Sequence, residues 1–179
     1  VGIDPRGTDP AAVREECLRL VDATAAYACA FKPNSAFFEA LGADGMTVLR
    51  EVVAHVPDGI PVILDAKRGD IADTAEAYAT AAFDRIGAHA VTLSPYLGGE
   101  ALRPFLSRAE RGAFVLCKTS NPGAGEFQDL TVTPGPPEPL YLRVARRAQQ
   151  WRTQNGADNI GLVVGATDPV ALARDRGVG

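Results

Sequence analysis

Two carboxylates and an ammonium group stand close together in the sequence, at the end of one apolar run. Asp65, Lys67 and Asp70 form the pattern D-x-K-x-x-D directly after residues 62–64. Side chains alternate between the two faces of a strand, so Asp65 and Lys67 are expected on one face, about 6–7 Å apart. Opposite charges this close, if held away from water, could hold a proton and transfer it. The pattern therefore indicates a candidate site for proton-transfer chemistry.

Two other interpretations compete with a chemical site. A D-x-K-x-x-D string can be solvated surface charge, and it can be a structural ion pair at a strand end. Here the charges follow a strand too apolar to lie on the surface, and Pro61 and Gly69 bracket the segment. This context disfavours surface charge, whereas the structural ion pair stays open.

Six apolar runs, each followed by a helical pattern, must position these residues. The runs are continuous rather than alternating, as expected of strands that are covered on both faces. Helix starts are marked by a capping residue followed by proline, as in Thr8-Asp9-Pro10 and Thr167-Asp168-Pro169. Six β-α units in this order predict an α/β fold with a parallel sheet. The strands are expected at 1–4, 28–32, 62–67, 90–95, 113–119 and 160–165, and the helices at 10–27, 35–55, 71–86, 100–110, 138–154 and 169–176.

Polar residues close most of the predicted strands. In a (β/α)8 TIM barrel all these strand ends meet at one mouth, where the active site lies. A doubly wound sheet would use mainly the strands at its switch point, and no G-x-G-x-x-G follows the first strand. We therefore predict a TIM barrel, with residues 1–179 forming one barrel domain. Because six units cannot close an eight-stranded barrel, strands seven and eight are expected to be missing, and the chain is expected to be truncated at its C-terminus. The polar strand ends are Asp4, Lys32, Asp65 with Lys67, Ser94 and Ser120.

Composition excludes several classes of protein. The net charge is −4 and no stripe of lysine and arginine is present, which argues against nucleic acid as the main partner. The cationic run from Arg143 to Arg147, with Arg152, is expected to be the solvated face of a helix. No signal peptide and no run of about 18 apolar residues occurs, which predicts a cytoplasmic protein.

The cysteines and histidines are scattered and form no metal-binding motif. Three cysteines without C-x-x-C spacing and two isolated histidines argue against a zinc site. Cys17 and Cys29 lie in apolar surroundings and are predicted to be small core residues.

Five motifs occur in a fixed order along the chain. The central one is Leu-Asp-Ala-Lys-Arg-Gly-Asp-Ile-Ala-Asp-Thr at 64–74, and the others are VGIDP at 1–5, AFKPN at 30–34, SPYLGG at 94–99 and KTSNPGA at 118–124. Together they resemble the orotidine 5′-phosphate decarboxylases, in particular the bacterial subgroup with the FKPN, LDAKRGDI and TSNPGA motifs. The resemblance covers nearly the whole chain.

The resemblance implies a carboxy-lyase that converts orotidine 5′-monophosphate to uridine 5′-monophosphate and CO2 in de novo pyrimidine biosynthesis, with no metal and no organic cofactor. Lys67 would be the general acid that protonates C6 of the pyrimidine. Asp65 would strain the substrate carboxylate and, with Asp70, keep Lys67 protonated.

The resemblance also implies the binding residues and a homodimer. Lys32 would join an alternating Lys-Asp-Lys-Asp network and reach the ribose, Asp4 would contact a ribose hydroxyl, and Ser120 would hydrogen-bond the pyrimidine. Asp70 and Thr74 would be contributed to the neighbouring subunit's site. Ordinary structural roles for Lys32, Thr74 and Ser120 stay open.

The sequence contains no counterpart of the loops with which the family binds the substrate phosphate. The family binds phosphate at the loops after strands seven and eight, so these residues are expected beyond Gly179. Gln128 lies in the wrong segment to be the family's phosphate-binding glutamine.

Three further functions compete with cofactor-independent decarboxylation, of which a phosphate-binding isomerase barrel is the weakest because its acid/base pair would usually be Glu or His. Magnesium-dependent relatives, such as 3-keto-L-gulonate 6-phosphate decarboxylase and hexulose-phosphate synthase, share D-x-K-x-x-D but carry an acid at the end of strand two. This chain has Lys32 there, and an ammonium group cannot replace an oxygen ligand of Mg²⁺. A non-catalytic barrel fragment is the second alternative, supported by the missing strands.

Overall fold

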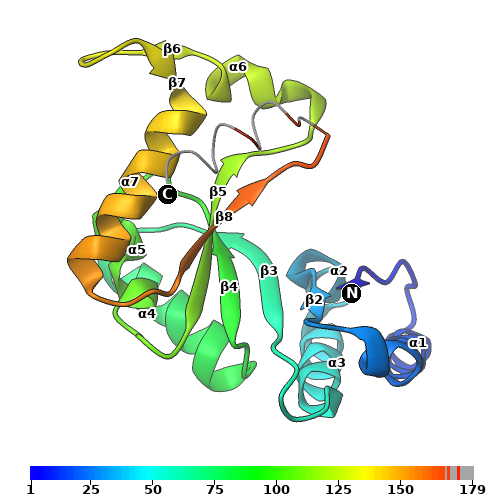
Figure 1. The fold of residues 1–179 in the computed structure, drawn as a ribbon. Coiled ribbons are helices and arrows are strands. Elements are labelled where there is room, and N and C mark those ends of the chain that lie inside the picture. Colours follow the sequence, from blue (N-terminus) through cyan, green and yellow to red (C-terminus); the bar gives the residue numbers. More distant parts are fainter. Residues whose placement is uncertain (168, 170–172, 174–179) are drawn as a thin grey trace. The chain divides into compact units, whose positions relative to one another are not determined.

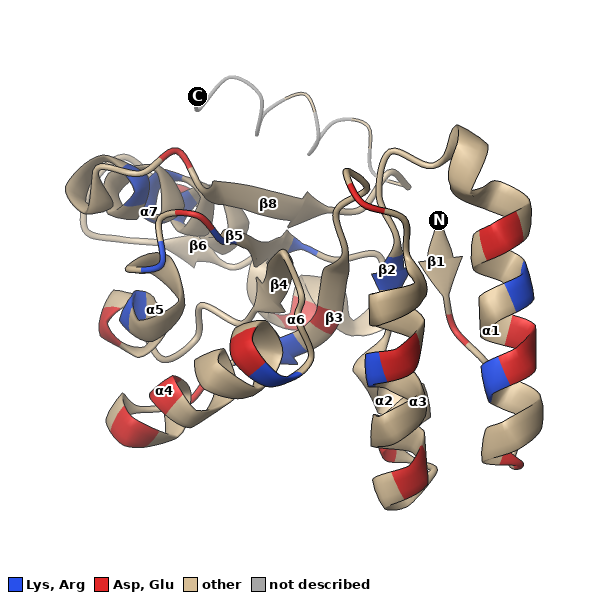
Figure 2. Ribbon diagram, turned by 90° about the horizontal axis from the view of Figure 1, so that it is seen from below, with Lys and Arg blue, Asp and Glu red and all other residues tan. Residues whose placement is uncertain are grey.

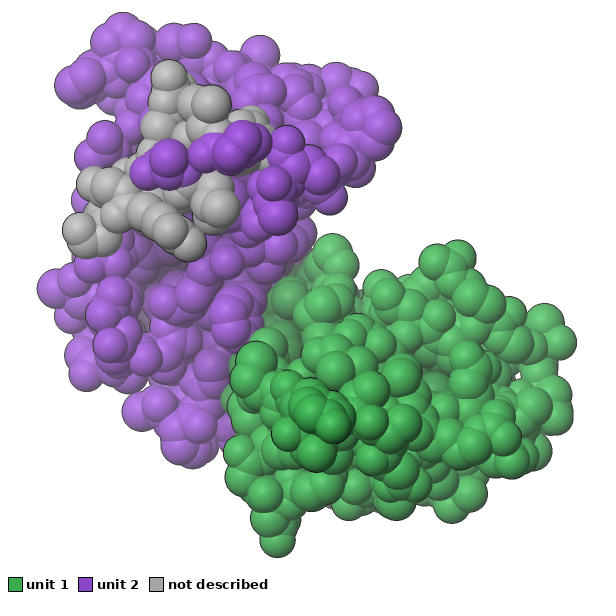
Figure 3. Space-filling view, turned by 45° about the vertical axis from the view of Figure 1, so that its right-hand side comes forward, with its two compact units in different colours: residues 1–68, 73–92 green, residues 69–72, 93–179 purple. Residues whose placement is uncertain are grey.

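The computed structural model describes residues 1–167, 169 and 173, which fall into two compact units. Unit 1 comprises Val1–Arg68 and Asp73–Thr92, and unit 2 comprises Gly69–Ala72 and Leu93–Gly179 (Figure 3). Each unit alternates strands with helices, as Figure 1 shows along the chain. Strand pairing is parallel between β1 and β2 in unit 1 and between β5 and β8 in unit 2, so the predicted α/β fold class is confirmed.

Unit 1 brings the ends of its strands to one edge. β1 (Gly2–Ile3) pairs with β2 (Lys32–Pro33), and single parallel bridges from Phe31 to Val62 and from Asn34 to Asp65 tie the β2 segment to β3 (Ile63–Arg68). β4 (Ala90–Leu93) is the neighbour of β3 in the sheet. Because parallel strands end at the same edge, the side chains that close β1, β2 and β3 are collected there.

The helices of unit 1 follow the capping signals of the sequence. Helix α1 (Pro10–Thr24) begins after Asp9, whose carboxylate accepts hydrogen bonds from two backbone N–H groups of the first turn. Its buried residues, Val13, Cys17 and Val21, recur every fourth position and pack toward α3 (Gly42–His55).

The single helix predicted over 35–55 is two helices. Helix α2 (Ser35–Glu39) ends before Gly42, which adopts φ 68°, and α3 then starts in a new direction. The two helices approach closely at Gly45, where an added Cβ would lie 2.0 Å from the carbonyl oxygen of Phe38. A short 3-10 turn, η1 (Ala25–Tyr27), extends α1, and α4 (Ala72–Thr80) runs on into a π-helical turn, η2 (Ala81–Arg85).

Unit 2 is built around the β5–β8 pair. β5 (Gly112–Lys118) and β8 (Ile160–Val164) are in register from Ala113 and Ile160 onward, with a bulge between Leu116 and Lys118. Helix α7 (Leu140–Asn155) packs on this pair through a buried cluster of Cys117, Tyr141 and Ala145. Helix α5 (Gly99–Leu106) also contacts β5.

A hairpin that the sequence analysis did not predict precedes α7. After η3 (Pro122–Ala124) and α6 (Gly125–Gln128), β6 (Thr131–Val132) pairs with β7 (Glu138–Pro139) in antiparallel fashion, so the helix predicted from 138 starts at Leu140. Figure 2 shows the basic residues along α7. Two of them, Arg143 and Arg146, bind Glu138 at 2.6 and 2.8 Å, and these bonds hold the Glu138 pKa below its ordinary value. Arg146 and Arg147 are exposed as predicted, whereas Arg143 is partly buried, and Arg143 and Arg146 also form an ion-pair cluster with Glu138.

Three remaining predictions concern single features. Cys17 is buried as predicted, whereas Cys29 is exposed, so its assignment to the core is wrong. The helix predicted at 169–176 falls almost entirely outside the described residues. Among the described residues, none of the helices has both the length and the apolar character that a membrane crossing requires.

Candidate active site

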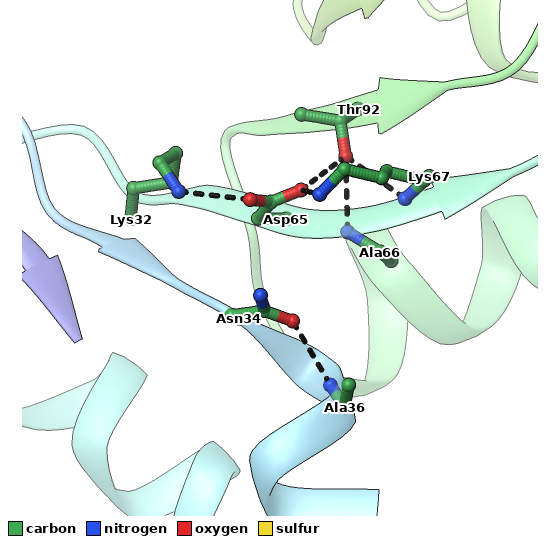
Figure 4. Close-up of polar contacts among 7 residues, drawn as sticks. All are labelled: Lys32, Asn34, Ala36, Asp65, Ala66, Lys67 and Thr92. Atoms are coloured by element: carbon green, nitrogen blue, oxygen red, sulfur yellow. Dashed lines mark hydrogen bonds and ion pairs between the residues drawn. The ribbon is translucent and has the colours of Figure 1, made fainter. Parts of the chain in front are cut away.

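One carboxylate, that of Asp65, is shared by two lysines at the strand ends of unit 1. The Lys32 ammonium, on β2, lies 2.8 Å from Asp65 Oδ2, and the Lys67 ammonium, on β3, lies 2.6 Å from Asp65 Oδ1 (Figure 4). Asn34, between β2 and α2, lies beside this group and uses its side chain to cap α2 through the N–H of Ala36. Asp65 and Lys67, which the sequence placed on one face, thus form a direct contact, and Lys32 joins it.

Burial differs sharply between the acid and its partners. The Asp65 side chain is 10% exposed, whereas those of Lys32 and Lys67 are 42% and 48% exposed. Burial by itself opposes ionisation of Asp65, but hydrogen bonds from Lys32, Lys67 and Thr92 outweigh it and lower the Asp65 pKa. The site therefore holds a buried, ionised carboxylate below two ammonium groups that reach the surface.

Thr92 on β4 is a component that the sequence analysis missed. Its hydroxyl lies 3.0 Å from Asp65 Oδ1 and is buried with it. It also accepts hydrogen bonds from the backbone N–H groups of Ala66 and Lys67. The only signal in the sequence was a single hydroxyl within the apolar run Ala90–Leu93, on the strand that follows the D-x-K-x-x-D segment.

Arg68 anchors the end of β3 on two sides. Its guanidinium pairs with Glu39 of α2 and lies 4.9 Å from the centre of the Tyr78 ring on α4. Both contacts stay within unit 1. The residue directly after Lys67 is therefore fixed by the helices on either side of β3.

Asp4 and Thr74, the other predicted residues of unit 1, form no described bond with this cluster. Asp4 follows β1 and is exposed, and Thr74 is exposed in the first turn of α4. Asp70 belongs to unit 2, where its side chain accepts a hydrogen bond from the N–H of Ile71 at 2.8 Å. Within unit 1 the direct partner of Lys67 is thus Asp65.

Ser120 lies in a loop of unit 2 whose neighbouring residues are firmly held. The Gln128 side chain binds Thr119 twice, by accepting from its N–H at 2.9 Å and donating to its hydroxyl at 2.8 Å. Lys118, on the other side of Thr119, is buried and pairs with Asp129. Gln128, which the sequence analysis excluded as a phosphate ligand, therefore braces the segment that presents Ser120.

Gly165 forms the surface behind Ser120. Its N–H donates to the carbonyl oxygen of Lys118 at 2.7 Å, and a Cβ at this position would lie 3.0 Å from the Cβ of Ser120. A side chain at 165 would therefore press on Ser120. Among the described residues, no group of three or more His, Cys, Asp and Glu is arranged to hold a metal ion.

Comparison with known protein families assigns the chain to one of them. The profile of the orotidine 5′-phosphate decarboxylase / HUMPS family matches residues 1–178. This α/β chain with parallel strands and a lysine-carboxylate cluster at its strand ends therefore belongs to that family.

Individual relatives give the same result. The chain is 52% identical over 184 residues to the orotidine 5′-phosphate decarboxylase of Roseiflexus castenholzii, covering 98% of this chain and 66% of the relative. The structure of Leishmania donovani OMP decarboxylase matches with a TM-score of 0.93 and 56% identity, covering 99% of this chain and 69% of that chain. The structure of Leishmania donovani UMP synthase matches with a TM-score of 0.94 and 56% identity, covering 99% and 39%. The chain thus spans about two thirds of the length of the curated relatives it matches most extensively.

Proposed function

We propose that this protein removes the C6 carboxylate of orotidine 5′-monophosphate and so forms uridine 5′-monophosphate in de novo pyrimidine biosynthesis. The observation that carries the proposal is the Lys32–Asp65–Lys67 cluster in a chain of this family. Relatives that are about half identical are named orotidine 5′-phosphate decarboxylase, which supports the same reaction here.

The proposed step needs a positive charge beside C6, to stabilise the electron pair left there, and a proton to replace the carboxylate. The C6–carboxylate bond breaks, CO2 leaves, and its electron pair stays at C6. The Lys67 ammonium, 2.6 Å from Asp65, stabilises that charge and then donates a proton to C6. A new C6–H bond forms, and the neutral amine takes up a proton from water. Asp65, buried and ionised, would face the substrate carboxylate and orient both lysines.

The remaining contacts would bind the nucleotide. Lys32 and Asp4 close neighbouring parallel strands and are proposed to reach the ribose. Ser120 is exposed in a braced loop and is proposed to hydrogen-bond the pyrimidine.

A metal-free site is favoured over the magnesium-dependent reactions of related barrels. At the end of β2 the chain presents the Lys32 ammonium, which is bound to one oxygen of Asp65. A hard cation would need that oxygen free and further oxygen ligands around it. Turnover that survives EDTA supports this choice, and activity that EDTA abolishes and magnesium restores would contradict it.

We further propose that the active protein is a homodimer in which Asp70 and Thr74 serve the partner's site. Thr74 is exposed, and the segment after Asp70 exposes Ile71 by 59%, while Tyr96 of the same unit is 87% exposed. Thr74 and Ile71 are therefore accessible to a second subunit.

Hybrid dimers test this arrangement. Lys67→Ala and Asp70→Asn each inactivate a site, but one site of a mixed dimer keeps both residues. Refolding an equal mixture should restore about a quarter of the wild-type activity, because half of the dimers are mixed and one of their two sites is intact. No recovery in a proven dimer would place both residues in one subunit's site.

Two predictions from the sequence remain proposals of the same kind. We propose that residues 1–179 belong to a single barrel domain, supported by one solved decarboxylase chain that matches 99% of their length. We also propose that the enzyme acts in the cytoplasm, in keeping with the biosynthetic reaction proposed above.

Turnover of orotidine 5′-monophosphate by the intact protein is the decisive experiment. UMP formation should be lost almost completely in Lys67→Ala, and also in Lys67→Arg, because a guanidinium keeps the charge but does not release its proton. Arg19→Ala is the matched control, since it removes an exposed cation from an ion pair on α1. A wild-type protein without UMP formation would support the non-catalytic alternative, and normal turnover by Lys67→Ala would exclude this proton donor.

A further inference from the structure

We propose that Thr92 is the positioning residue of this site, because its hydroxyl ties the backbone at Ala66 and Lys67 to the Asp65 carboxylate. The inference rests on the proposed decarboxylase function. Thr92 would not touch the substrate. It would set the place from which the Lys67 ammonium acts.

The Thr92 hydroxyl uses all of its hydrogen-bonding capacity within the site. Its oxygen accepts from the N–H of Ala66 at 3.0 Å and from the N–H of Lys67 at 2.9 Å (Figure 4). Its hydrogen goes to Asp65 Oδ1 at 3.0 Å. A threonine hydroxyl has one hydrogen and two lone pairs, and an ionised carboxylate only accepts, so each bond has one possible direction.

The two N–H donors can meet on one oxygen only because the strand turns at its end. In an extended strand, successive N–H groups point in opposite directions. Lys67 instead has φ 49°, a left-handed conformation that is unfavourable for a residue with a Cβ. The two hydrogen bonds to the Thr92 oxygen stabilise this left-handed turn. The unusual backbone of Lys67 and the position of Thr92 are therefore one feature.

Thr92 also fixes the carboxylate from its buried side. Asp65 Oδ1 receives both the Thr92 hydroxyl and the Lys67 ammonium. Thr92 is 4% exposed, so its bond is shielded from water, whereas the lysine side chain is half exposed. The exposed Lys67 ammonium is thus bound to a carboxylate that the buried Thr92 hydroxyl holds in place.

Two substitutions separate the hydroxyl from the shape of the side chain. Thr92→Val keeps the volume but removes the donor and the acceptor, and Thr92→Ser keeps both. We expect Thr92→Val to lower kcat about 10- to 100-fold, the range expected for a hydrogen bond to a charged group. KM should change much less, because Thr92 is not proposed to touch the substrate. Thr92→Ser should recover most of the lost kcat.

The matched control is Thr47→Val, whose exposed hydroxyl donates to the Ala43 carbonyl within α3. It should leave kcat unchanged. A folded Thr92→Val with wild-type kcat would overturn the inference while leaving the proposed function intact. A loss that Thr92→Ser does not restore would also overturn it.

Two measurements do not depend on turnover, and the first of them needs no variant. In the wild-type protein the amide hydrogens of Ala66 and Lys67 should exchange slowly with solvent, and rapid exchange of both would contradict the bonds to Thr92. Lysine occurs only at 32, 67 and 118, so acetylation by acetic anhydride can be followed at each site by mass spectrometry. Lys67 should react several-fold faster in Thr92→Val, with buried Lys118 as the reference. If the wild type forms no UMP but these two results hold, the proposed function fails and the positioning role stands.

Discussion

Replacing Asp65 by Asn tests the centre of the site, because the amide keeps the shape of the carboxylate and removes its charge. In the wild type, one oxygen faces Lys32 at 2.8 Å and the other faces Lys67 at 2.6 Å. In the variant, one of these oxygens becomes an NH2 group, which is a donor and cannot bind an ammonium. At least one lysine therefore loses its partner.

The expected loss follows from these two contacts. A hydrogen bond to a charged group contributes about 1.5–3 kcal/mol, and the exposure of both lysines places these bonds at the low end. Bonded to two oxygens of one carboxylate, the ammonium groups lie roughly 5–6 Å apart, and their repulsion is about 1–3 kcal/mol between effective dielectric constants of 80 and 20. A misplaced Lys67 should thus cost about 3 kcal/mol in the transition state, or a loss of about two orders of magnitude in kcat/KM. Global stability should fall by only about 1 kcal/mol, because water can solvate the freed lysines.

The assay compares Asp65→Asn with Asp58→Asn, which removes an exposed carboxylate from a loop of the same unit. Both variants are measured for UMP formation and for urea unfolding at neutral pH. Asp58→Asn should behave as wild type in both. A folded Asp65→Asn with kcat/KM within threefold of wild type would refute the reasoning. So would a loss of activity that is matched by an equally large loss of stability, because the residue would then be structural.

Three further predictions concern pH, thiol chemistry and the loop of unit 2. Because the pKa of Asp65 is lowered in the folded protein, ionised Asp65 stabilises the fold above the unfolded-state pKa of about 4, and this stabilisation is lost as pH falls through the folded-state pKa. Urea unfolding should therefore show that the difference in stability between wild type and Asp65→Asn shrinks below pH 4. Burial, aided by Glu16, raises the pKa of Cys17 to about 11, so a thiol reagent at pH 8 should modify exposed Cys29 rapidly and leave Cys17 unmodified, as peptide mapping would reveal. Gln128→Leu should raise KM several-fold with a smaller change in kcat, because it removes both bonds that brace the loop next to Ser120; unchanged steady-state constants would show that the brace is dispensable.

Much of the fold could be predicted because its signals are local. Continuous apolar runs marked the longer strands, and the Asp9-Pro10 cap marked the first helix residue correctly. The sequence also predicted that Asp65 and Lys67 share one face, and their side chains do meet, although the left-handed backbone of Lys67 departs from the strand geometry behind that prediction. The break at Gly42 could not, because a glycine within a helical pattern signals a turn only when tertiary contacts require one.

The features of the candidate site that the sequence did not predict depend on contacts between segments that are distant in the chain. Nothing in the spacing along the chain states which residue of β4 faces Asp65, and a threonine in a strand is ordinary by propensity. The left-handed turn at Lys67 was hidden for the same reason, since a D-x-K pattern is expected to continue as a strand. The Gln128–Thr119 bonds form across a loop that has no periodic pattern. Sequence periodicity thus located the charged groups, whereas the groups that orient them required the structure.

The distribution of cations in this chain points to where a proton can come from. The chain has 18 lysines and arginines, and lysine occurs only at 32, 67 and 118. Each lysine lies on a strand and binds a carboxylate, Lys118 to Asp129 and the other two to Asp65. Arginine is not deprotonated in proteins, so it can orient an anion but cannot protonate a carbanion. Lys118 is buried against the Tyr141 ring, where it holds a loop. The proposed proton donation is therefore left to the pair on Asp65, and of these two Lys67 is the one whose backbone N–H binds the Thr92 hydroxyl, the same group that binds Asp65.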